Sequence, residues 1–156
     1  MTEELRFERS IDARRDVVFE LFTDPDGQIA FYRQGEPDWV VRSECDLRIG
    51  GVWQVEFGPS EGEIYTHRHV FKVIDPPQRL VFSTHETRPD GSGFDSETEI
   101  LFNERGAQTV MRVIQRGFPT EELRYEHSAG LPEAFAQFER FVVGVVKARA
   151  RGLRDG

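Results

Sequence analysis

The chain has 156 residues and a formal net charge of −8. This length suits one domain, and 38% hydrophobic with 12% aromatic residues is typical of a folded chain rather than a disordered one. The acidic excess would repel nucleic-acid phosphates and the basic residues form no cluster, so we expect no nucleic-acid partner. We therefore expect a single domain over residues 1–156, with its core between about residues 5 and 150.

The sequence also predicts where the protein works. A single cysteine, Cys45, cannot form an internal disulfide, which fits a reducing compartment. The first residues are charged rather than apolar, unlike a secretory signal peptide. No apolar run approaches the about 20 residues that a membrane span needs. We expect a cytoplasmic protein with no membrane partner.

The first predicted elements are a strand and two short helices. Leu5–Ile11 alternates apolar and polar residues, which is the period of a half-buried strand. The segment after Asp12 carries apolar residues at helical spacing up to Phe22. Pro25 follows a polar break, and proline suits the first turn of a second short helix.

Alternating residues then predict about six strands between Pro37 and Gln115. Turn residues separate them, and strands joined by short turns run antiparallel. The connection richest in glycine and polar residues is Arg88–Gly93. The expected strands are Trp39–Asp46, Trp53–Phe57, Glu63–Asp75, Leu80–Thr87, Ser96–Asn103 and Gln108–Gln115.

The rest of the sequence predicts helix. Thr120 suits an N-cap, and Glu121 and Glu122 suit a first helical turn. A long amphipathic helix is expected from about Leu131, with Pro132 in its first turn. It can cover one face of the sheet, so the predicted class is α+β: a curved antiparallel sheet of about seven strands, two short helices between the first two strands, and a long C-terminal helix. The first strand is expected to pair with the last.

Five short motifs occur in an order that indicates a family. In that order they resemble the START-like superfamily (SRPBCC proteins, with the helix-grip fold). The nearest resemblance is to the family named for the activator of the Hsp90 ATPase, which has many small single-domain bacterial members. The resemblance covers the chain from about Phe7 to Val146 and implies a sheet wrapped around the long helix, with a cavity between them. The motifs are Ile11–Pro25, Asp46–Trp53, Pro76–Phe82, Thr109–Phe118 and His127–Leu131.

The sequence departs from the family pattern beside that expected cavity. The family usually has tryptophan near the end of the second helix, where this chain has Phe31 and Tyr32. It usually has tryptophan after the glycine that matches Gly130, where this chain has Leu131. Glycine is common at the position of His69. The resemblance therefore implies a cavity but no particular ligand, because a fold does not fix a function.

The alternation along the strands also predicts which side chains face the helix. Most of these are apolar and a few are polar, a mixture typical of a small-molecule pocket. A core filled by the same side chains is the alternative. Cys45 is interpreted as a small buried side chain rather than a nucleophile. The candidate ligand-binding residues are Trp39, Val41, Cys45, Trp53, Val55, His67, His69, Phe82, Thr98, Met111, Val113, Gln115, Phe135 and Phe138.

His67 and His69 are the residues best suited to chemistry. They lie two apart on one strand, so both rings project to the same side. A metal site would need a third ligand from Cys45, Glu86 or His85, but the spacing selects none of them, and we predict no metal ion and no cofactor. Either histidine could act as a general acid or base, because imidazole titrates near neutral pH. The leading interpretation is that both line a pocket and hydrogen-bond to a ligand.

Three functions remain open from the sequence. The leading one is binding of a small hydrophobic or aromatic molecule between the sheet and the long helix. The second is an enzyme of cyclase or hydrolase type with His67 or His69 as general acid or base. The third is a protein-interaction domain, by analogy with the chaperone activator, which would have a filled interior. His127 belongs either to the pocket mouth or to the surface. Phe141 and Val143 widen the apolar face of the long helix and raise a homodimer as an expectation.

Overall fold

The computed structural model describes residues 4–155, which fold into one curved sheet and three helices. The predicted α+β class, with two short helices between the first two strands, is confirmed. In chain order the elements are β1 (Leu5–Ile11), α1 (Arg15–Phe22), α2 (Pro25–Arg33), β2 (Val40–Cys45), β3 (Val52–Gly58), β4 (Tyr65–Asp75), β5 (Arg79–Thr87), β6 (Gly93–Arg105), β7 (Gln108–Arg116) and α3 (Glu121–Asp155).

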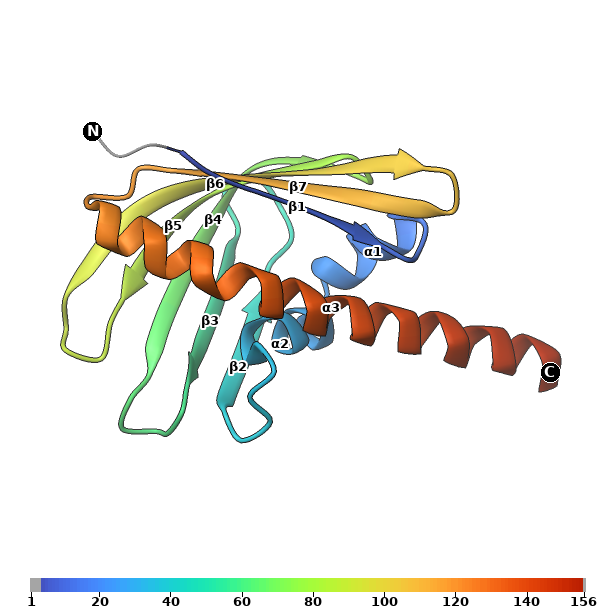
Figure 1. The fold of residues 1–156 in the computed structure, drawn as a ribbon, viewed down its shortest axis with the longest axis horizontal. Helices are drawn as coiled ribbons and strands as arrows, with labels where there is room; N and C mark the ends of the chain where they lie inside the picture. Colours follow the sequence, from blue (N-terminus) through green and yellow to red (C-terminus); the bar gives the residue numbers. More distant parts are fainter. Residues whose placement is uncertain (1–3, 156) are drawn as a thin grey trace.

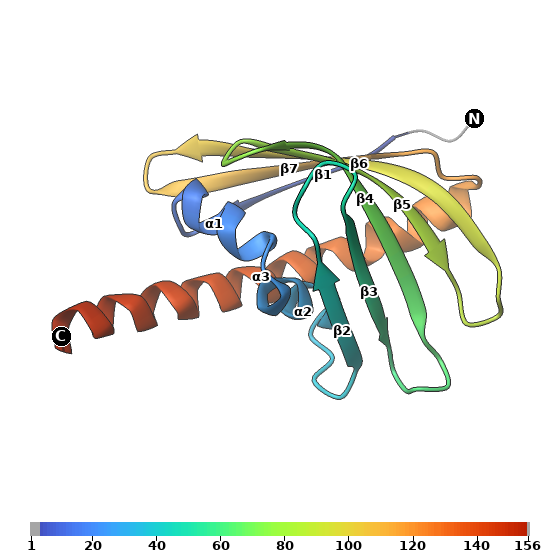
Figure 2. The same cartoon turned by 180° about the vertical axis from the view of Figure 1, so that it is seen from behind.

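The seven strands form one antiparallel sheet in the order β1-β7-β6-β5-β4-β3-β2. The first strand pairs with the last, as expected, with Phe7 opposite Val113. The sheet curls around α3, which crosses its concave side, and α1 and α2 lie at one end of that concave side (Figures 1 and 2). The C-terminal part of α3 extends beyond the sheet in both views.

The start of α2 is determined by its local sequence. The Asp24 side chain accepts a hydrogen bond of 2.9 Å from the backbone N–H of Asp26, and Pro25 occupies the first turn. Proline costs nothing there because the first N–H groups of a helix have no partner within the helix. The helix therefore begins where the sequence predicts it.

The long helix differs from the prediction. Thr120 Oγ1 accepts a hydrogen bond of 3.2 Å from the N–H of Leu123, so the N-cap is correct, but α3 continues from Glu121 without the break expected before Leu131. Pro132 lies inside the helix rather than in its first turn. Proline removes one backbone donor, and burial of residues on either side of it, such as Leu131 and Ala134, holds the helix together. Within residues 4–155, no helix is both long enough and apolar enough to cross a membrane.

An aromatic cluster joins α1, the concave side of the sheet and α3. Phe22 of α1 packs edge-to-face against Trp53 of β3, Phe102 of β6 and Phe138 of α3, with ring centroids 5.8, 6.1 and 5.4 Å away. All four side chains are buried. This cluster ties α1 and α3 to the sheet.

Candidate ligand-binding site

A cavity of about 380 Å³ lies between the concave side of the sheet and the N-terminal half of α3. This volume is in the range of small-molecule sites. Aromatic rings form much of the wall, among them Phe31, Trp53, Phe82 and Phe135. Polar side chains from β4, β5 and the beginning of α3 form another part of it. The cavity therefore combines an apolar wall with a concentrated polar region.

Most of the candidate residues named from the sequence border this cavity. The period of two along each strand places their side chains on the concave side of the sheet, and the period of α3 turns Phe135 toward it. The candidates that line the cavity are Trp39, Trp53, His67, His69, Phe82, Thr98, Val113, Gln115 and Phe135.

The other candidates do not belong to the cavity lining. Val55, Met111 and Phe138 are completely buried in the core. Val41 and Cys45 are half-buried on β2, the edge strand, and burial raises the pKa of the Cys45 thiol. The sequence period shows which face of a strand is inward but not how far along the strand the cavity extends.

Several polar residues of the lining were not assigned to ligand binding from the sequence, and five of them meet at the polar part of the wall. The alternation places Thr84 and Glu86 on the inward side of β5, so this period is the observation that could have selected them. Arg88 follows the same strand. Tyr32 comes from α2 and His127 from α3, and no local pattern brings these two helices to the same wall.

Buried polar side chains form a continuous hydrogen-bonded chain from β5 through β4 and α2 and back to β5. Thr84 Oγ1 lies 2.6 Å from His69 Nδ1, and His69 Nε2 lies 2.8 Å from the Tyr32 hydroxyl. The same hydroxyl lies 2.8 Å from His67 Nδ1, and His67 Nε2 lies 2.5 Å from Glu86 Oε1. All five residues are at least nine-tenths buried. We call this set the polar chain.

Counting donors and acceptors gives every hydrogen bond of the polar chain a direction. Ionised Glu86 only accepts, so His67 Nε2 carries a proton and donates to it. In a neutral imidazole the other nitrogen, Nδ1, then accepts from the Tyr32 hydroxyl. The Tyr32 oxygen in turn accepts from Nε2–H of His69, whose Nδ1 accepts from the Thr84 hydroxyl. Each buried polar atom is thereby satisfied, and every donor points toward Glu86.

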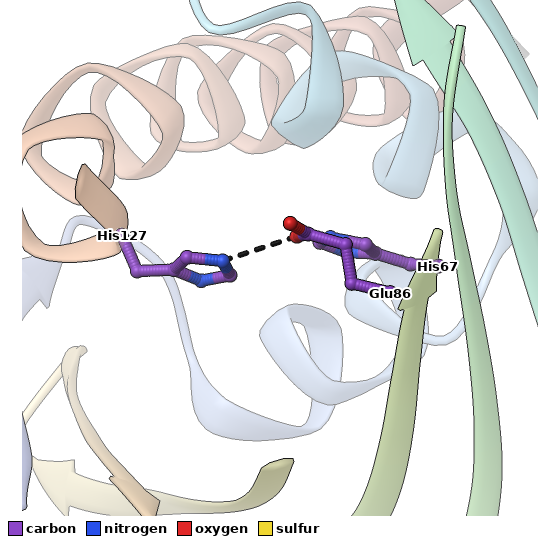
Figure 3. Close-up of side chains that lie close together, drawn as sticks. All are labelled: His67, Glu86 and His127. Carbon is purple, nitrogen blue, oxygen red and sulfur yellow. Dashed lines mark hydrogen bonds and ion pairs between the residues drawn. The ribbon is translucent and has the colours of Figure 1, made fainter. Parts of the chain in front are cut away.

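The carboxylate of Glu86 also accepts hydrogen bonds from two residues that do not belong to the polar chain. Nε2 of His127 donates to Oε1 over 3.1 Å, and Arg88 donates to Oε2 over 3.1 Å. Arg88 forms a second ion pair of 3.2 Å with Glu126 of α3. Figure 3 shows the side chains of His67, Glu86 and His127, which come from β4, β5 and α3 and meet at this carboxylate.

The pKa shifts agree with these assignments. Burial raises the pKa of Glu86, but hydrogen bonds from His127 and His67 outweigh it, and the pKa of this carboxyl lies far below its ordinary value. Burial lowers the pKa of His67, against the opposing effect of Glu86, and it lowers the pKa of His69 further. Burial also raises the pKa of Tyr32. At neutral pH the polar chain therefore holds one carboxylate, two neutral imidazoles and a neutral phenol.

The structure changes which side chains could hold a metal ion. The sequence analysis considered the pair His67 and His69 with an unknown third ligand. The ligand atoms that lie together instead belong to His67, Glu86 and His127, all within 4.8 Å of one another. His69 faces Tyr32 and Thr84 and is not part of this group.

Comparison with known proteins agrees with the fold. The protein CV1439 from Chromobacterium violaceum has 19% identity and a TM-score of 0.78 over 90% of this chain and 98% of its own. The AHSA1-like protein from Aeromonas hydrophila has 22% identity and a TM-score of 0.71 over 92% and 94%. The AHSA1 protein SPO3351 from Silicibacter pomeroyi has 18% identity and a TM-score of 0.76 over 90% and 98%.

At these identities the structural likeness shows the fold alone. No curated protein has significant sequence similarity to the chain. The sequence profile of the activator of Hsp90 ATPase homolog 1-like proteins matches residues 12–142, which is most of the chain and includes the cavity wall from α2 to α3. The chain therefore belongs to the family of activator of Hsp90 ATPase homolog 1-like proteins.

Proposed function

We propose that the protein binds a small, largely apolar or aromatic molecule in the cavity between the sheet and α3. The observation that carries this proposal is the division of the cavity wall. Aromatic side chains such as Phe31, Trp53 and Phe135 offer flat apolar contact, while the region around Glu86 and His127 can receive a polar group.

The interior also bears on the alternative of a protein-interaction domain. A protein-interaction domain would have a filled interior. The cavity of about 380 Å³ instead leaves part of its apolar lining without packing contacts from other side chains. An empty apolar cavity costs stability because its wall loses packing contacts. A bound apolar molecule would recover those contacts, which favours ligand binding as the function.

A fluorescent apolar probe and a space-filling substitution test the proposal. Ala134 is buried and lines the cavity, so Ala134→Leu should reduce the space available to the probe. Ala136 lies on the same helix outside the cavity lining and supplies the matched control, Ala136→Leu. We expect the wild type and Ala136→Leu to bind the probe equally, and Ala134→Leu to bind it at least about tenfold more weakly, since a tenfold change needs only about 1.4 kcal/mol.

Native mass spectrometry identifies the ligand class in a second step. Protein purified from its own host should carry a small molecule that denaturing extraction releases and that Ala134→Leu no longer retains. A mass of the chain alone, together with equal probe binding by Ala134→Leu and the wild type, would contradict the proposal and favour a protein partner.

Acid–base catalysis is a second candidate, and one observation favours it. The three inner groups of the polar chain, His67, Tyr32 and His69, can each donate and accept, so a proton can shift between the Glu86 end and the Thr84 end. If the bound molecule is also a substrate, Tyr32→Phe should keep its binding and lose its conversion. Recovery of the molecule chemically unchanged after incubation with the wild type would contradict this second candidate.

A further inference from the structure

We propose that His67, Glu86 and His127 form a binding site for one divalent transition-metal ion of the zinc type, at the polar wall of the cavity. The ligand atoms are Nε2 of His67, Oε1 of Glu86 and Nε2 of His127, which all lie within 4.8 Å of one another. They come from β4, β5 and α3 and point toward a common centre (Figure 3).

The donor set fits such an ion. Two imidazoles and one carboxylate are a frequent ligand set for zinc, which takes four ligands in a tetrahedron. Since all three residues line the cavity, the fourth position faces it and is open to water or to an oxygen or nitrogen atom of a bound molecule. Three protein ligands with one open position are typical of catalytic rather than structural zinc.

The present distances are close to those that the ion requires. His67 Nε2 and His127 Nε2 lie 2.5 and 3.1 Å from Glu86 Oε1. Tetrahedral ligands about 2.0–2.2 Å from zinc are about 3.3–3.5 Å apart, so the two histidine–glutamate separations need to widen by about 1 Å or less. The two imidazole nitrogens, which lie within 4.8 Å of one another, need to approach by at most about 1.5 Å. The His127 side chain is 19% exposed at the beginning of α3 and has more freedom to move than buried His67.

Arg88 prepares Glu86 to act as a ligand through one oxygen. Its guanidinium binds Oε2 over 3.1 Å and leaves Oε1 to the two histidines. The positive charge of Arg88 lies close to the proposed ion, but its ion pair with Glu126 over 3.2 Å offsets that charge. A hydrogen bond to the free oxygen is the usual way in which an outer residue orients a carboxylate ligand.

The polar chain can adapt to the ion without leaving a buried polar atom unpaired. When Nε2 of His67 binds metal, the proton of this neutral imidazole resides on Nδ1 and is donated to the Tyr32 oxygen. The Tyr32 hydroxyl then donates to His69 Nε2, and His69 Nδ1–H donates to Thr84 Oγ1. The three hydrogen bonds that join Thr84, His69, Tyr32 and His67 remain with their directions reversed. The metal ion replaces the fourth hydrogen bond, between His67 Nε2 and Glu86 Oε1, so the polar chain accommodates both the free and the metal-bound states.

Metal titration of the untagged full-length protein tests the site. After dialysis against a chelator, Zn²⁺ is titrated by calorimetry, and Co²⁺ by its visible absorption, which reports a tetrahedral site. We expect one ion per chain. Glu86→Gln and His127→Ala should each weaken binding by more than about 100-fold, whereas Tyr32→Phe, which alters only an outer contact, should weaken it by about 10–100-fold.

His85→Ala is the matched control. His85 lies next to Glu86 on β5, is exposed, and forms a 2.8 Å pair with Asp95 of β6, so it belongs to another histidine–carboxylate pair nearby in the sheet. This variant should bind metal like the wild type. Wild-type protein that binds no Zn²⁺, or affinities of Glu86→Gln and His127→Ala equal to that of the wild type, would overturn the proposal.

The proposed metal site and the proposed binding of an apolar ligand can be tested separately. The site shares its wall with the proposed ligand-binding cavity but does not depend on an apolar ligand. Apolar-probe binding by chelator-treated protein tests the cavity alone, and His85→Ala, at a residue outside the cavity lining, should retain it. Circular dichroism verifies that each variant is folded, and the ¹⁵N resonances of the His67 and His127 rings should move with Zn²⁺ and not with Mg²⁺.

Discussion

The Tyr32 hydroxyl on α2 lies 2.8 Å from Nε2 of His69 on β4, two positions at which the resemblance to the family implies a different usual residue. Both side chains are buried, and a buried polar group without a partner is costly. Each supplies the partner that the other needs. The two departures are therefore one structural unit, which joins a helix to the sheet at the cavity wall.

This pairing predicts a loss of stability in Tyr32→Phe. The substitution removes the hydroxyl between His67 and His69 and leaves two buried ring nitrogens without a partner. An unsatisfied buried polar group costs about 1–3 kcal/mol, so we expect the free energy of unfolding to fall by about that amount. Urea denaturation measures it. Tyr125→Phe, at a residue that is 73% exposed, is the control, and equal stability of the two variants would show that the hydroxyl is not needed.

Two glycine-to-alanine substitutions should have opposite effects. A Cβ on Gly27 of α2 would lie 1.8 Å from the backbone oxygen of Leu21, so Gly27→Ala must move α2 away from α1 and should cost about 1–3 kcal/mol or more. A Cβ on Gly144 of α3 would meet nothing within 4 Å, so Gly144→Ala should stabilise the helix by about 0.5–1 kcal/mol. Thermal unfolding compares them, and a melting temperature that rises in both would contradict the close packing of α1 and α2.

Phe138→Ala should lower the stability of the core without weakening ligand binding in the cavity. Phe138 is completely buried against Phe22 and does not line the cavity. Truncation of a buried phenylalanine costs about 3–5 kcal/mol, which urea denaturation will show. Apolar-probe affinity of the folded variant should stay within about twofold of the wild type, since twofold is only about 0.4 kcal/mol. Unchanged stability with lost probe binding would place Phe138 at the ligand instead.

An ion pair between helices should make one end of α3 sensitive to pH. Arg149 binds Glu20 of α1 over 2.6 Å, and this hydrogen bond lowers the pKa of Glu20. The folded state therefore favours the ionised form, so the stabilisation is complete above the unfolded carboxyl pKa of about 4.3 and is lost as the pH falls through the lower folded value. Both side chains are about half exposed, so we expect an effect below about 1 kcal/mol.

Amide exchange measures this effect locally. Protection factors for residues 145–152 should be lower at about pH 3 than at about pH 6 in the wild type. In Glu20→Gln they should be low at both values, because the pair is absent throughout. Equal protection of the wild type and Glu20→Gln at the higher pH would show that the ion pair does not hold this end of the helix.

Most helices and strands were predictable because their sequence patterns depend only on residues that are close together in the chain. The alternation that marks Leu5–Ile11 and the other strands follows from the pleat of each strand, and Asp24 and Pro25 mark the beginning of α2 by local hydrogen bonding. The prediction that the long helix begins at about Leu131 was wrong, because proline at position 132 was interpreted as part of a first helical turn, whereas α3 begins at Glu121. Packing on both sides of that proline, which no local pattern contains, overrides the preference of proline for the first turn.

The candidate site was predictable only in part. Periodicity places His67 and His69 inward and together, but it suggested that both face one ligand or metal. In the structure both rings contact the Tyr32 hydroxyl, and their other nitrogens meet different partners, Glu86 for His67 and Thr84 for His69. Which ring nitrogen meets which partner depends on side-chain packing between elements, which the spacing of two residues cannot specify.

The sequence by itself determined the order of the elements and the inward face of each strand, since both follow from local spacing of residue types. The family was indicated by the resemblance of five short motifs. Only the tertiary structure decided that Tyr32, Glu86 and His127 meet beside His67. These residues come from α2, β5, α3 and β4, and their meeting point depends on the curl of the sheet and on where α3 crosses it. Both are set by the packing of the whole core, such as Phe22 against Phe138, and not by any single segment.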